Sequence, residues 1–149
     1  MDETDATARI DLRRLWWAGP LTILAAVIVD LAIMWTARAL IDVDPGFKPF
    51  SELQVAGLTV LGVGAGVAAF AVIARKASRP VQTFRVVALV ALLLSFIPDI
   101  GLLVTKPYPG SEPAPVGILM LMHVAAAAIT VGMLEALTVR RGRARPEQV

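Results

Sequence analysis

Residues 15–40 read LWWAGPLTILAAVIVDLAIMWTARAL, and this stretch decides the fold class. It is apolar almost throughout, and a helix needs only about 20 residues to cross about 30 Å of hydrocarbon. Three further apolar runs follow at about residues 53–74, 84–105 and 116–139. Because backbone groups in lipid must be hydrogen-bonded within the segment, the sequence predicts four membrane-spanning helices.

The composition is typical of an integral membrane protein. Of the 149 residues, 57% are hydrophobic and only 17% are charged, which excludes an ordinary soluble globule. We therefore expect one all-α domain, an integral membrane four-helix bundle, with short disordered tails at residues 1–8 and 140–149. The chain has no cysteine, so disulfides and cysteine-ligated metal centres are excluded.

The distribution of Lys and Arg predicts the orientation, because positive residues near the ends of spans are retained in the cytoplasm. Two basic residues, Lys48 and Lys106, lie in the loops after the first and third runs. Eleven lie in the two terminal flanks and the middle connector: Arg9, Arg13, Arg14, Arg75, Lys76, Arg79, Arg85, Arg140, Arg141, Arg143 and Arg145. Both termini are therefore expected on the cytoplasmic side.

A cleaved signal peptide is the competing interpretation of the first run. Ala37-Arg38-Ala39 has the small-x-small form of a cleavage site. A typical signal core is shorter, however, and does not carry an acid such as Asp30 in its middle. A membrane span is the preferred interpretation.

The ionisable residues inside the spans carry most of the functional information, because each costs several kcal/mol unless it faces the bundle interior, water or a partner. Asp30, Asp99 and His123 are all expected between the midplane and the outer surface. Pro98 precedes Asp99 and predicts a kink or wide turn. Two interpretations remain open: the three side chains converge on an outward-opening polar pocket that binds a cation or relays protons, or they hydrogen-bond across helices to fix the packing.

The sequence predicts no metal and no cofactor. Met34, Met120 and Met122 near His123 include ligand types that copper favours, but Met120 and Met122 point about 200° apart on a helix. Arg38 is expected to reach the interface or pair with Asp42. Anchoring is likewise the expectation for Glu135, which the basic connector can neutralise.

Small residues predict close helix packing in the second and fourth spans. The helical spacing of glycine and alanine lets backbones approach closely, which supplies association that hydrophobicity cannot provide in lipid. The residues concerned are Gly62 and Gly66 in the second span and Ala128 and Gly132 in the fourth, where Ala125 and Ala136 extend the same face. The contact can be intramolecular or can form a homodimer.

With these residues in place, the chain resembles a family of small bacterial four-span membrane proteins catalogued as a domain of unknown function. The resemblance covers about residues 13–138 and rests on residues 14–20, Asp30, the stretch 84–99 and residues 121–126. The family has no assigned activity, so the resemblance implies four spans and transfers no chemistry.

The sequence therefore favours a structural or accessory protein of the bacterial inner membrane, whose partners are the bilayer and a second copy or a larger membrane complex. The alternative is a small proton- or cation-coupled transporter that uses Asp30, Asp99 and His123. An enzyme is not expected, since the segments outside the membrane are short; an intramembrane lipid-modifying enzyme using Asp99 and His123 is a further alternative. Nucleic-acid binding is not expected either, because aromatic residues do not interleave with the basic clusters.

Overall fold

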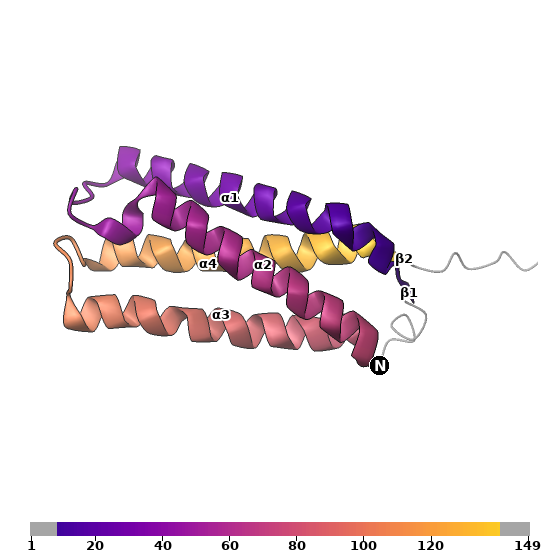
Figure 1. Cartoon of the computed structure of the whole chain (residues 1–149). Coiled ribbons are helices and arrows are strands. Elements are labelled where there is room, and N and C mark those ends of the chain that lie inside the picture. Colours follow the sequence, from indigo (N-terminus) through magenta and orange to yellow (C-terminus); the bar gives the residue numbers. More distant parts are fainter. Residues whose placement is uncertain (1–8, 141–149) are drawn as a thin grey trace, which may run out of the picture.

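The computed structural model describes residues 9–140, and within them it contains four long helices (Figure 1). Their bounds are Leu15–Leu40 for α1, Glu52–Lys76 for α2, Pro80–Thr105 for α3 and Pro113–Thr138 for α4. All four are long and apolar enough to cross a membrane. The prediction of an all-α four-helix protein is confirmed. The predicted tails fall outside the described residues, apart from Arg140.

Each of the later helices begins a few residues before the apolar run that predicted it. Pro80 and Pro113 occupy the first positions of α3 and α4, where a missing backbone N–H costs nothing because it has no partner inside the helix. α2 starts at Glu52, an acid in the first turn, which is favourable at the positive end of the helix dipole.

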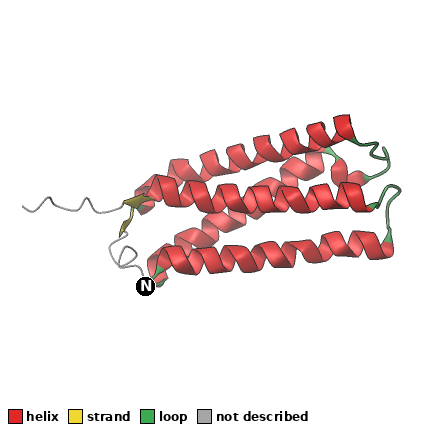
Figure 2. Ribbon diagram, turned by 180° about the vertical axis from the view of Figure 1, so that it is seen from behind, coloured by secondary structure: helices red, strands yellow, loops and turns green. Residues whose placement is uncertain are grey.

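The helices form an antiparallel bundle in which α4 lies between α1 and α3 (Figures 1 and 2). α2 crosses the bundle obliquely and contacts all three other helices, although its contact with α4 is the smallest. The start of α1, the end of α4 and the α2–α3 connector lie at one end, here called the terminal end. The α1–α2 and α3–α4 loops lie at the other, the loop end (Figure 1).

Two apolar clusters hold the bundle together. The loop-end cluster is built from α1, α2, α4 and the first loop, and its buried members are Met34, Ala37, Phe47, Phe50, Val55, Val116, Leu119 and Met122. The terminal-end cluster is smaller and joins Phe70, Phe84 and Leu134 from α2, α3 and α4. In it, the rings of Phe70 and Phe84 meet edge to face with centroids 4.8 Å apart.

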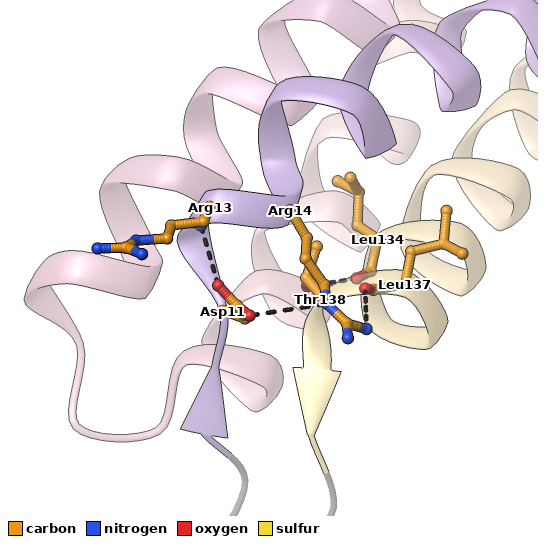
Figure 3. A network of polar contacts seen from close by, with 6 residues as sticks. All are labelled: Asp11, Arg13, Arg14, Leu134, Leu137 and Thr138. Carbon is orange, nitrogen blue, oxygen red and sulfur yellow. Dashed lines mark hydrogen bonds and ion pairs between the residues drawn. The ribbon is translucent and has the colours of Figure 1, made fainter.

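A short antiparallel strand pair closes the terminal end, and the sequence did not predict it. β1 (Arg9–Ile10) pairs with β2 (Val139–Arg140), so Arg140 is ordered in a strand and not part of a tail. Beyond the pair, the Asp11 backbone N–H donates to the Thr138 carbonyl at 2.9 Å. Figure 3 shows the Arg14 side chain between the Asp11 carboxylate and the Leu137 carbonyl. These contacts fasten the start of α1 to the end of α4.

The two loops at the loop end touch each other through their Pro-Gly sequences. A Cβ built on Gly46 would lie 3.2 Å from Pro109 Cγ. Gly110 has a φ of +76°, and a Cβ there would lie only 2.6 Å from Asp44 Cβ. Glycine is therefore required at 110 for its backbone angle and for the close approach of the loops.

Candidate functional site

Each helix contributes one polar side chain to a cluster in the half of the bundle nearer the loop end. The four residues, here called the polar cluster, are Asp30 from α1, Thr59 from α2, Asp99 from α3 and His123 from α4. Both aspartates are deeply buried, with exposed fractions of 2% for Asp30 and 5% for Asp99. Buried carboxyl groups inside a membrane span need a partner or a function.

The position of the cluster follows from the apolar core. Asp30, Thr59 and His123 each lie one helical turn from a buried residue of the loop-end cluster: Met34, Val55 and Leu119 respectively. Residues one turn apart share a helix face, so packing of the loop-end cluster directs these three polar side chains inward as well. The core thus determines that they meet.

The first contact in the cluster joins α1 to α2. The Thr59 hydroxyl donates a hydrogen bond of 2.7 Å to Asp30 Oδ2, while Asp30 Oδ1 is buried without a hydrogen-bond partner. Sequence reasoning missed Thr59. Other helical threonines donate to the carbonyl four residues earlier in their own helix, at Thr22, Thr36, Thr105, Thr130 and Thr138. Nothing in the sequence distinguishes Thr59 from these.

The second contact joins α3 to α4. His123 Nδ1 lies 3.1 Å from Asp99 Oδ2 and 2.9 Å from the carbonyl oxygen of Leu119. Only the Leu119 contact has the alignment of a hydrogen bond, so Asp99 Oδ2 remains without one and its contact with the imidazole is electrostatic. The ring of Phe96 meets the imidazole edge to face, with centroids 6.4 Å apart.

The two contacts form one electrostatic unit, because Asp30 is also close enough to His123 for their charges to interact. The side chain of His123 is 39% exposed, whereas the carboxyl groups are covered. Of the three residues that the sequence singled out, the structure brings Asp99 and His123 into contact, while Asp30 contacts Thr59. Such a unit can hold a proton or pair helices.

The cluster does not line either of the two pockets that the structure gives within residues 9–140. The larger pocket, of about 890 Å³, lies at the loop end, and its charged lining residues are Arg38, Asp42, Asp44 and Lys48. The smaller, of about 300 Å³, lies beside it between the two loops. The outward-opening pocket expected around Asp30, Asp99 and His123 is thus not one of these two.

Pro98 does not interrupt α3. The helix is α-helical from Pro80 to Thr105, and Pro98 is on its exposed side, next to the buried Asp99. The wide turn expected there is not formed, because the α-helix continues without a break through Pro98; the expected kink stays a prediction. The proline therefore faces away from the cluster.

Of the four residues predicted to make close helix contacts, one makes such a contact within the bundle and three do not. A Cβ on Gly66 would lie 3.2 Å from Thr130 Cγ2, so Gly66 is where α2 approaches α4. Gly62 and Gly132 have no atom within 4 Å of a Cβ position, and Ala128 is exposed. The close intramolecular contact expected at these three positions is not made, while Gly66 does contact α4 where the oblique α2 crosses the bundle (Figure 1).

Two ion pairs link helices on either side of the cluster. Arg38 donates to Glu52 and to the Phe50 carbonyl, both at 2.5 Å, and so joins α1 to the start of α2; the pairing expected with Asp42 is not the one formed. Near the terminal end, Arg85 Nε and Nη2 donate to the two oxygens of Glu135 at 2.7 and 2.5 Å. Glu135 is neutralised by a residue of the basic flank, as the sequence indicated.

No group of three or more His, Cys, Asp or Glu side chains that could hold a metal ion occurs among the residues the structure describes. Met34 and Met122 are packed into the loop-end cluster. The fold and the site together define a small multi-pass membrane protein, an antiparallel four-helix bundle with a buried polar cluster contributed by all four helices.

The chain belongs to the family of unknown function DUF6069, whose family model matches residues 10–140. The resemblance to a family without an assigned function, drawn from the residues alone, is confirmed. No curated protein and no solved structure matches the chain.

Proposed function

We propose that this protein is a non-enzymatic structural or accessory component of a bacterial inner membrane, and that its polar cluster fixes how its helices pair. The observation that carries the proposal is the distribution of polar cross-links. Asp30–Thr59 and Arg38–Glu52 join α1 to α2, and Asp99–His123 and Arg85–Glu135 join α3 to α4. Each hairpin is thus held by two polar contacts.

Such contacts supply specificity that apolar packing in lipid does not. Lipid tails are as apolar as leucine, so helices are held together by packing and by interhelical hydrogen bonds worth about 0.6 kcal/mol on average and up to about 1.7 kcal/mol. A polar side chain that slides out of register would be left unpaired in hydrocarbon, at a higher cost. The cross-links therefore select one register for each hairpin.

The segments outside the helices support a role without catalysis. The α2–α3 connector consists of residues 77–79, and the other two connections are the loops at residues 41–51 and 106–112. These are too short to fold a catalytic domain. The expected partners are the bilayer and either a second copy of the chain or a larger membrane complex, and the exposed Ala128 and Gly132 offer a smooth surface for such a partner.

The proposed orientation has both termini in the cytoplasm, and it is supported by the excess of Lys and Arg in the terminal flanks and the α2–α3 connector. Reporter fusions that are active on only one side of the membrane test it. A fusion at either terminus should report the cytoplasm, and a fusion inserted after Gly110 should report the opposite side. The reverse pattern would refute the orientation.

A double-mutant cycle on Asp30→Asn and Thr59→Val tests the packing role. We expect each single variant to lower the free energy of unfolding, with a coupling energy of about 0.5–1.5 kcal/mol between them. Unfolding is followed by tryptophan fluorescence during titration of the micelle-embedded protein with SDS. Asp42→Asn, at an exposed loop position, is the matched control. A coupling energy near zero would contradict the packing role.

The second candidate function is a small proton- or cation-coupled transporter. It is favoured by one observation: Asp30 Oδ1 is buried without a hydrogen-bond partner. Packing alone would be served by a neutral, fully bonded amide, so a carboxylate oxygen left unsatisfied calls for another explanation. Flux measured in proteoliposomes under an imposed ion gradient, wild type against Asp99→Asn, tests this function.

A further inference from the structure

The position of the hydrogen on the neutral imidazole of His123 follows from its neighbours. Nδ1 lies 2.9 Å from the carbonyl oxygen of Leu119 and 3.1 Å from Asp99 Oδ2. A carbonyl oxygen can only accept a hydrogen bond, and an unprotonated Nδ1 would place its lone pair against both oxygens. The neutral ring therefore carries its hydrogen on Nδ1, and Nε2 is the nitrogen that remains to gain or lose a proton.

The surroundings of the ring are suited to a positive charge. α3 presents Asp99 beside Nδ1, and α1 presents Asp30 within electrostatic range. α2 contributes Thr59, which is not titratable and bonds to Asp30. Among the contacts of residues 9–140, no Lys or Arg side chain is paired with any member of the cluster. Within the described residues, the cation in contact with Asp99 is therefore the imidazolium of His123.

We propose that the polar cluster is an intramembrane proton-binding site in which His123 Nε2 takes the proton and Asp99 and Asp30 balance the charge of the imidazolium. The step is a simple association: a proton from hydronium forms an N–H bond at Nε2, water is released, and nothing is oxidised or reduced. The His123 side chain is 39% exposed at the bundle surface, whereas both carboxyl groups are buried.

The proton fits this site better than a metal ion does. Nδ1 is occupied by its own hydrogen, which leaves one nitrogen as a ligand, and Asp99 contacts the Nδ1 side of the ring. In the described part of the chain no three donors of the kinds that hold a metal are grouped. A proton needs only the one nitrogen and the compensating charges.

The inference deepens the transporter candidate but does not depend on it, because a proton can bind without being carried across the membrane. The two are separated by different measurements. Binding is read from the ring nitrogens, and transport from a pH-sensitive dye inside proteoliposomes. If Nε2 is protonated but no proton flux is measured, the transporter hypothesis is refuted and the proton-binding site is retained.

Nitrogen-15 NMR on the protein in nanodiscs tests the site directly, since His123 is the only histidine in the chain and its ring signals need no assignment. In the neutral form we expect Nδ1 to be protonated and Nε2 to be bare. On acidification Nε2 should gain the proton while the helical circular dichroism is unchanged. A neutral ring with its hydrogen on Nε2, or an Nε2 that stays bare until the protein unfolds, would overturn the proposal.

Variants test the charge compensation. Asp99→Asn should weaken proton binding at Nε2 by about tenfold or more, as expected on removing an opposite charge a few ångströms away, and Asp30→Asn should weaken it in the same direction. Asp42→Asn should leave it unchanged. If Asp99→Asn does not fold, Asp30→Asn still tests whether a carboxyl group balances the charge of the imidazolium. Proton binding that is unaffected by the variants that fold would show that the carboxyl groups do not balance the ring, and the site as proposed would be wrong.

Discussion

Replacing Gly110 with alanine should separate the two loops at the loop end and destabilise the whole bundle. The residue has a φ of +76°, and its added Cβ would lie 2.6 Å from Asp44 Cβ and within 3.3 Å of Phe47 Cβ. A Cβ atom moves only with its backbone, so no rotamer change of Asp44 can relieve the contact. The loops must move apart instead.

The expected loss has two parts. The left-handed backbone angle costs a non-glycine residue about 1–2 kcal/mol. Forcing packed groups apart costs about 1–3 kcal/mol more. We therefore expect Gly110→Ala to lower the free energy of unfolding by about 2–5 kcal/mol, measured by SDS titration and tryptophan fluorescence.

Gly132→Ala is the matched control for this experiment. Its Cβ would meet no atom within 4 Å, and it lies inside α4, where alanine is favoured over glycine by about 0.5–1 kcal/mol. The two variants should thus change stability in opposite directions. A Gly110→Ala protein as stable as wild type would refute the contact between the loops.

The remaining predictions concern contacts between helices. Glu135→Gln removes the carboxylate that accepts two hydrogen bonds from Arg85. It should lower the free energy of unfolding by about 0.5–1 kcal/mol, a small value because the arginine is well exposed. A loss of stability that does not shrink in high salt would argue against an ion pair. Gly66→Leu should lower the free energy of unfolding by about 1–3 kcal/mol, because Thr130 already lies against Gly66. Gly62→Leu should lower it by less than about 0.5 kcal/mol, since no atom lies near that position. Equal losses of stability in the two variants would contradict the oblique path of α2.

The sequence by itself determined the number of spans and identified the ionisable residues inside them. Apolar runs of this length have one stable form in lipid, because a helix forms its backbone hydrogen bonds within its own segment, whatever helices surround it. The same reasoning singled out Asp30, Asp99 and His123, since ionisable groups inside a span are costly wherever the helices lie. Both results depend only on local sequence.

The tertiary structure decided which of these groups touch. Thr59 binds Asp30, and Gly66 approaches α4 while Gly62 does not, because the tilt of α2 brings only part of each face against a neighbour. Tilt is set by the summed packing of side chains from several helices, and no single segment encodes it. Three members of the polar cluster, Asp30, Asp99 and His123, were therefore predictable from the sequence, but Thr59 and the pairing of the four side chains were decided only by the packed bundle.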